Sequence, residues 1–178
     1  NGAKPIPAAA LSVPDAEQLE RIIARGKPVQ LHLTLTPRMT GIHQSGNVIA
    51  EVPGRDSKAG VVLIGGHLDS WDLGTGAIDD AAGLAITTAA AKRILDGLKP
   101  KRTIRLVWFG AEEEGGFGGE AYAKAHGTEK HALTAEADFG ADRVWQFRTH
   151  FADANSPLLT ELTLSLIHIS EPTRPRLI

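Results

Sequence analysis

The chain contains no cysteine, so none of its 178 residues can form a disulfide bond or a thiolate metal site. An excess of charge of either sign is also missing. Lys and Arg total 19, Asp and Glu total 21, and the net charge is −2 with neutral histidines. This balance, without a basic cluster, gives no indication of nucleic-acid binding. Apolar runs stay well short of the about 18 residues of a membrane helix, so no membrane span is expected.

One stretch carries most of the candidate chemistry, residues 65–83, which read GGHLDSWDLGTGAIDDAAG. The apolar run 60–64 precedes this stretch and a helical pattern follows it. Such an order predicts a buried strand that ends in a polar loop and then a helix. Histidine and carboxylate side chains together are ligands that zinc accepts. The alternative for the His67 and Asp69 pair alone is a surface histidine bonded to a neighbouring carboxylate.

Two further apolar runs also end in acidic residues. Residues 107–111 lead into Glu112, Glu113 and Glu114, and residue 137 leads into Asp138. If these acids converge at one sheet edge, two carboxylates about 4 Å apart repel by about 4 kcal/mol at an effective dielectric of 20. A cation would remove that repulsion. The alternative for residues 112–114 taken alone is a solvated acidic turn.

Periodicity and turn signals predict the remaining elements. The pattern over residues 80–96 is helical, with Thr87, Ala91 and Leu95 among the residues that share its inner face, and residues 103–109 are expected to form a strand. The strand–helix–strand order from 60 to 109 favours a parallel crossover and an α/β fold. Histidines 32, 43, 126 and 131 are expected at the surface. The other expected helices cover residues 12–25, with Ser12 as N-cap, residues 120–126, after a glycine-rich bend over 115–119, and a segment from 156. Strands are expected over residues 29–36, 47–52, 133–137 and 143–148.

Four blocks of this sequence resemble a known family. GHLDSWD (66–72), GAIDD (76–80), AEEEGG (111–116) and EADFG (136–140) are similar, in order and spacing, to the di-zinc exopeptidase family that contains carboxypeptidase Q. The resemblance covers roughly residues 5–162. It implies a three-layer α/β/α sandwich of the zinc-dependent exopeptidase type. It also implies that residues 1–40 are the end of a protease-associated insert, and residues 41–164 the N-terminal half of the zinc peptidase domain.

The resemblance further implies roles for individual residues. His67, Asp79 and Asp138 would hold one Zn²⁺, and Asp79 would bridge to a second Zn²⁺ that Glu113 also binds. The general base would be Glu112. Asp69 would orient His67. The family's last ligand, a histidine well downstream of the third carboxylate block, has no matching position in this chain.

The implied function is hydrolysis of peptide bonds in dipeptides or short peptides, by a hydroxide held between two zinc ions, with Glu112 as general base. Two alternatives stay open: a non-catalytic binding or receptor domain on the same scaffold, and a one-zinc acyltransferase of the glutaminyl cyclase type. The retained acids Asp79, Glu112 and Glu113 argue against the binding domain. A secreted or periplasmic location is expected, and a homodimer is left open.

The last segment differs in character from the rest. Residues 165–178 fit neither helical nor strand periodicity and are expected to be an adapter-derived or disordered tail outside the fold. The chain begins with Asn1, not with Met. The sequence is therefore expected to be a fragment cut at both ends, and whether the fragment is active is left open.

Overall fold

The computed structural model describes residues 6, 8–36, 38, 40–97, 99–138, 140–141, 148–150 and 155–162. The chain divides into two compact units, Asn1–His43 and Gln44–Ile178, which are described separately. The expected tail at 165–178 and nearly all of the expected strand at 143–148 lie outside the described residues. Within the described residues, no helix has the length and apolar character that crossing a bilayer requires.

The first unit contains helix α1, Val13–Ile23. Ser12 caps it as predicted, because its side chain accepts a hydrogen bond from the backbone N–H of Asp15 at 3.3 Å. The strand predicted over residues 29–36 is wrong, since those residues form no strand and Leu31 and Leu33 are 61% and 59% exposed. Alternating apolar residues stabilise a strand only beside a partner strand and a core, and this unit supplies neither among its described residues.

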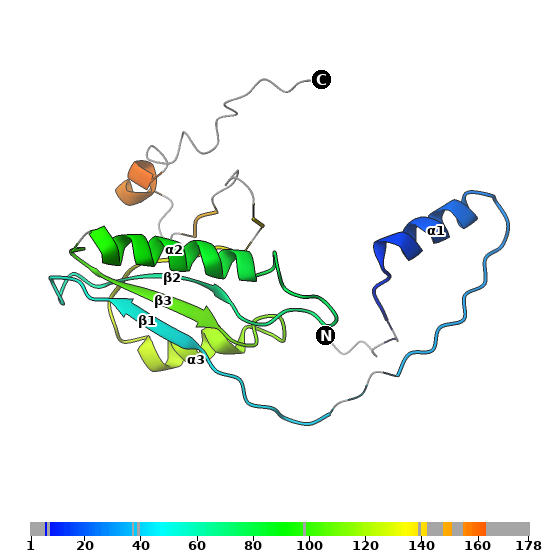
Figure 1. Cartoon of the computed structure of the whole chain (residues 1–178), viewed down its shortest axis with the longest axis horizontal. Helices are drawn as coiled ribbons and strands as arrows, with labels where there is room; N and C mark the ends of the chain where they lie inside the picture. Colours follow the sequence, from blue (N-terminus) through cyan, green and yellow to red (C-terminus); the bar gives the residue numbers. More distant parts are fainter. Residues whose placement is uncertain are drawn as a thin grey trace, which may run out of the picture. The chain divides into compact units, whose positions relative to one another are not determined.

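The second unit is built on a four-stranded sheet in the order β1-β3-β2-β4. The strands are β1 Val48–Val52, β2 Val61–His67, β3 Thr103–Phe109 and β4 His131–Glu136. Strand β2 pairs in parallel with β3 and β4, whereas β1 pairs antiparallel with β3. Helix α2, Ala81–Gly97, lies on one face and helix α3, Phe117–His126, on the other (Figure 1). The predicted α/β fold with three layers is therefore confirmed.

Each face of the sheet has its own small core. Along β2, Val62 and Ile64 pack toward α2, whereas Leu63 packs toward α3, as strand alternation requires. The core on the α2 side is formed by Val52, Ala91 and Ile104, and the core on the α3 side by Leu63, Val107 and Tyr122. The two cores fix the sheet between its helices, and thereby fix the strand ends.

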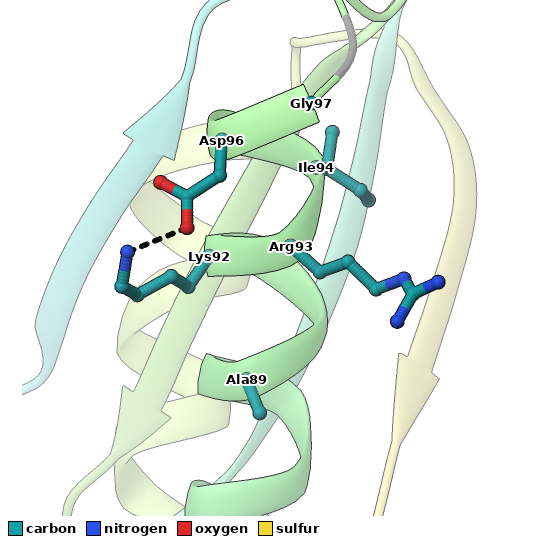
Figure 2. Close-up of a pocket in the computed structure, with 6 residues that line it drawn as sticks. All are labelled: Ala89, Lys92, Arg93, Ile94, Asp96 and Gly97. Atoms are coloured by element: carbon teal, nitrogen blue, oxygen red, sulfur yellow. Dashed lines mark hydrogen bonds and ion pairs between the residues drawn. The ribbon is translucent and has the colours of Figure 1, made fainter.

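Helix α2 buries the face that its periodicity predicts at Thr87 and Ala91. Leu95 was also placed on that face, which is wrong: it is 61% exposed. Figure 2 shows a pocket beside the C-terminal end of α2, where Lys92 and Asp96 pair at 2.6 Å. The residues that line it are Ala89, Lys92, Arg93, Ile94, Asp96 and Gly97. This surface ion pair is of the i,i+4 kind and stabilises the helix by about 0.3–0.5 kcal/mol.

A buried arginine organises the face under α3. Arg105 of β3 is 8% exposed and donates to Tyr122 Oη at 2.8 Å and to Glu51 at 2.7 Å, and it pairs with Glu129 at 2.7 Å. Burial lowers the pKa of Arg105, but these hydrogen bonds outweigh burial and raise it, so the guanidinium stays charged. The charge therefore has the partners that burial demands.

Two histidines join this network, and their expected surface position is wrong. His126 stacks on Tyr122 with ring centroids 4.5 Å apart and lies 2.6 Å from Glu129. His131 Nε2 lies 2.8 Å from Tyr122 Oη. Both histidines are half-buried because α3 and β4 converge on Arg105, a convergence that the local sequence of neither histidine indicates.

Helix α3 begins at Phe117, three residues before the predicted start at residue 120. The glycines 118 and 119 are therefore helical and not part of a bend. A Cβ on Gly118 would lie 2.5 Å from Asn47 Oδ1 and would also strike the Gly110 carbonyl, whereas a Cβ on Gly119 meets nothing within 4 Å. The first glycine is required by packing and the second is not.

These neighbours form a matched pair for mutation. We expect Gly118→Ala to lower the free energy of unfolding by about 2 kcal/mol, the usual cost of forcing an atom into a packed site. Gly119→Ala should raise it by about 0.5 kcal/mol, because alanine favours the helix. Urea unfolding of both variants measures the difference. Equal effects of the two substitutions would contradict the packing described here.

Candidate metal centre

The parallel strands end at one edge of the sheet. His67 is the last residue of β2 and pairs in register with Phe109, the last residue of β3. Strand β2 was predicted to end at residue 64. It continues through Gly65 and Gly66 because these glycines allow close packing: a Cβ on Gly65 would strike the Val107 carbonyl. His67 is therefore held by a strand and does not lie in the loop.

The imidazole of His67 is at the centre of the site. Its side chain is 1% exposed. The ring atom Nε2 lies 2.9 Å from Asp79 Oδ1 and 3.2 Å from Asp138 Oδ1, although Asp138 is 71 residues away. The other ring nitrogen, Nδ1, lies 2.9 Å from the backbone carbonyl oxygen of Asp69. The Nε2 edge of the ring thus points at two carboxylates, while Nδ1 contacts a backbone carbonyl oxygen.

Asp69 connects the loop after β2 to the turn after β3. Its Oδ1 accepts from the backbone N–H of Glu112 at 2.9 Å and its Oδ2 from that of Glu113 at 3.0 Å. Burial raises the pKa of Asp69, but these backbone hydrogen bonds outweigh it and lower the pKa. The carboxylate oxygen Oδ1 is 3.8 Å from His67 Nδ1, so the closer contact to the histidine is made by the Asp69 carbonyl.

Glu112 and Glu113 lie side by side in the turn between β3 and α3, and both are half-buried. The turn is closed by hydrogen bonds from the Gly115 and Gly116 amides to the Glu112 carbonyl, at 2.9 and 2.7 Å. The residue before it, Ala111, has φ 55°, a left-handed conformation that a residue with a Cβ adopts at a cost of about 1 kcal/mol or more. Burial raises the pKa of Glu112, which the charge of His67 partly offsets.

The acid that sequence reasoning missed is Asp80. It is 1% exposed, and it accepts from the His67 amide at 2.9 Å and from the Gly83 amide at 3.1 Å. The second bond makes Asp80 the N-cap of α2, and an aspartate directly before a helical pattern is the signal that could have indicated it. Burial raises the pKa of Asp80. A Cβ on Gly66 would strike this carboxylate.

The surrounding carboxylates change the pKa of His67. Burial lowers the pKa of His67, but the hydrogen bonds to Asp69 and Asp79 and the charges of Asp138 and Asp80 outweigh burial and raise it to about 9. Several carboxylates therefore favour positive charge at this position. A metal ion satisfies the same demand, and competes with the proton for Nε2.

The donor set fits a metal ion. Two groups have ligand atoms within 4.8 Å of one another, His67 with Asp79 and Glu113, and His67 with Asp80 and Asp138. An imidazole nitrogen with carboxylate oxygens is a combination that zinc accepts. Asp80 is the exception, because its two oxygens already accept from two backbone amides. The groups left to hold metal are His67, Asp79, Glu113 and Asp138.

Comparison with known proteins identifies the family. Residues 47–176 match the model of Peptidase family M28, a range that includes most of the segment 165–178. The chain is 42% identical over 143 residues to mouse carboxypeptidase Q and 40% identical to the human protein, in each case over 79% of this chain and 30% of the relative. It is 34% identical over 124 residues to a probable leucine aminopeptidase 2 of Arthroderma benhamiae, over 67% of this chain and 23% of that protein.

A solved structure gives the same result. The Peptidase M28 precursor from Shewanella amazonensis matches with a TM-score of 0.68 and 42% identity, over 96% of this chain and 38% of that one. The chain spans about 30% of the length of the curated carboxypeptidase Q relatives. Its fold, its acidic strand ends and the family match over most of its length agree: the chain belongs to Peptidase family M28.

Proposed function

We propose that this chain contributes the zinc ligands His67, Asp79, Glu113 and Asp138 to a zinc-dependent exopeptidase that hydrolyses dipeptides or short peptides. One observation carries the proposal. The buried ring of His67 directs Nε2 at Asp79 and Asp138, and Glu113 lies close enough to share a metal ion with His67 and Asp79. The relatives named carboxypeptidase Q and leucine aminopeptidase 2 support a peptidase that acts near a chain end.

The proposed metal site holds two Zn²⁺ ions. His67 and Asp138 would bind one ion, Glu113 the other, and Asp79 would bridge the two. Asp79 suits a bridging role because it lies 2.9 Å from His67 Nε2 and shares a candidate ligand group with Glu113. When bound, the ions lower the pKa of a water molecule and stabilise negative charge on the substrate carbonyl.

The chain's own residues would carry the proton and hold the geometry. Glu112, beside the ligand Glu113 and outside both metal-ligand groups, would take the proton of the attacking water and pass it to the leaving amine. Asp69 fixes the position of Glu112 through the Glu112 amide, and fixes the His67 ring through its own carbonyl. One residue, Asp69, thus positions both His67 and Glu112, and it would keep the metal ligand and the general base at a fixed distance from each other.

Two other functions remain to be separated from this one. A binding or receptor domain on the same scaffold would bind peptides without turnover, and would not need the positioned Glu112. A one-zinc acyltransferase of the glutaminyl cyclase type would cyclise N-terminal glutaminyl peptides. We favour the peptidase because Asp79 and Glu113 both lie at the site, which supplies carboxylates for two ions.

Metal removal and restoration test the proposal. The complete protein that contains this chain is treated with a chelator, then assayed with dipeptides and with N-terminal glutaminyl peptides while Zn²⁺ is added back. We expect dipeptide hydrolysis to vanish with the chelator and to return at two Zn²⁺ per site. Cyclisation without hydrolysis would identify the acyltransferase, and binding without turnover the receptor domain; either result would overturn the peptidase.

The chain's wider context follows from the same proposal. Residues 41–164 would form the N-terminal half of the peptidase domain, and residues 1–40 the end of a protease-associated insert. A secreted or periplasmic enzyme acting on short peptides fits these relatives. Size measurement of the complete protein decides whether it forms a homodimer.

A further inference from the structure

We infer that Asn47 is a positioning residue for the turn that carries Glu112 and Glu113, and that it thereby sets the turnover of the enzyme. The inference rests on the proposed function for its catalytic consequence. It deepens that function by naming a residue that lies outside the four motif blocks and contacts neither the candidate ligands nor the base.

The topology brings Asn47 to this turn. It directly precedes β1, which pairs antiparallel with β3 so that Val48 lies opposite Trp108. In such a pair the start of one strand lies beside the end of the other. Asn47 therefore arrives beside Gly110, the residue that follows β3 and begins the turn.

The side-chain amide of Asn47 then bridges the two ends of the turn. Its Oδ1 accepts from the Gly110 amide at 3.0 Å, and its Nδ2 donates to the Gly118 carbonyl at 2.8 Å. The two contacts need an acceptor on one side and a donor on the other, which a carboxamide supplies and which fix its orientation. A single side chain thus ties the end of β3 to the first turn of α3.

The packing around Asn47 leaves little freedom. Gly110 and Gly118 are both buried. A Cβ on Gly110 would lie 2.5 Å from Ser45 Oγ and 2.6 Å from the Gly46 carbonyl. A Cβ on Gly118 would lie 2.5 Å from Asn47 Oδ1. The two glycines let residues 45–47 pack closely against the turn, so the hydrogen bonds of Asn47 lie within a tightly packed contact.

The turn is held at its other side by Asp69. That carboxylate accepts from the amides of Glu112 and Glu113. Asn47 joins the two ends of the turn, and Asp69 holds the residues between them, Glu112 and Glu113. Without Asn47, the amide of Gly110, directly before Ala111, would lose its acceptor. The left-handed φ of 55° at Ala111 would then be held only from the far side, by Asp69 on the Glu112 amide and by the Phe117 amide on the Ala111 carbonyl. Strained backbone persists only where the surroundings enforce it, so the turn should relax.

The predicted effect falls on two observables. Substituting Asn47 by alanine should speed amide hydrogen exchange in residues 110–118 by about tenfold or more, the effect of losing hydrogen bonds of ordinary strength. In the zinc-loaded protein kcat should fall by about tenfold or more with KM within about twofold, since a displaced base weakens the transition state and not substrate binding.

Thr103→Val is the matched control. Thr103 Oγ1 accepts from the Gly54 amide at 3.1 Å, also between β1 and β3 but at the opposite end of the strand pair. Valine keeps the shape of the side chain and the strand preference. It should lower stability to a similar extent and leave kcat and the exchange of residues 110–118 unchanged. A structural loss alone would affect both variants alike.

The experiment measures exchange with and without Zn²⁺, and kinetics on a dipeptide, for both variants. If Asn47→Ala fails to fold, Asn47→Asp keeps the acceptor for Gly110 but places a carboxylate oxygen against the Gly118 carbonyl, and a change in the same direction is expected. Unchanged exchange over residues 110–118, or an equal fall in kcat in Thr103→Val, would overturn the inference. An inactive complete wild-type protein, loaded with Zn²⁺, would overturn the proposed function instead, and exchange would still report on Asn47.

Discussion

In the complete protein, Glu112→Gln is expected to retain Zn²⁺ and to lose about a thousandfold in kcat, within the range that a positioned general base contributes. The carboxylate of Glu112 belongs to neither group of candidate ligands, so its neutralisation leaves His67, Asp79 and Glu113 in place. Glutamine has nearly the same shape and cannot accept the proton of the attacking water. Steady-state kinetics on a dipeptide and zinc analysis of the same sample give both quantities.

Glu114→Gln is the control for this variant. It removes the same charge two residues further along the same turn, from an exposed side chain. We expect its kcat to stay within about twofold of the wild type, since surface charges contribute little. Near-normal turnover in Glu112→Gln would disprove the general-base assignment. An equal loss in Glu114→Gln would point to the net charge of the turn and not to one base.

Asp79→Ala should abolish both metal binding and turnover. Asp79 Oδ1 is 2.9 Å from His67 Nε2, and we propose that this carboxylate bridges the two metal ions. Its removal takes a ligand from each ion at once. The loss of zinc affinity should exceed the about 100-fold that loss of an outer-shell partner costs. Calorimetric titration of the apoprotein with Zn²⁺ measures it.

Asp72→Ala provides the comparison for this second variant. Asp72 lies in the same loop, is exposed, and is in neither of the candidate ligand groups. It should bind Zn²⁺ as the wild type does. If Asp79→Ala retained wild-type zinc affinity, the bridging role would be wrong, and the metal site would have to be rebuilt from His67, Glu113 and Asp138.

Much of the fold could be predicted from local signals. The Ser12 cap of α1 and strand β3, Thr103–Phe109, were predicted as observed, because capping and strand periodicity depend on neighbours along the chain. Helix α2 was predicted to within one residue at each end, and the strand–helix–strand order indicated the parallel sheet. The strand expected at 29–36 failed for the complementary reason, since a strand requires a partner that no local pattern supplies.

The sequence by itself determined the inventory of the site: which acids follow which strands, and that a histidine stands among them. The tertiary structure alone decided how they are used. It placed His67 in a strand, turned Asp69 toward the amides of the Glu112 turn, and buried Asp80 as a helix cap. These roles depend on hydrogen bonds between residues that lie up to 71 positions apart, such as His67 and Asp138. Periodicity and spacing describe only neighbours in the chain, so such contacts are fixed by the register of the sheet and not by any local pattern.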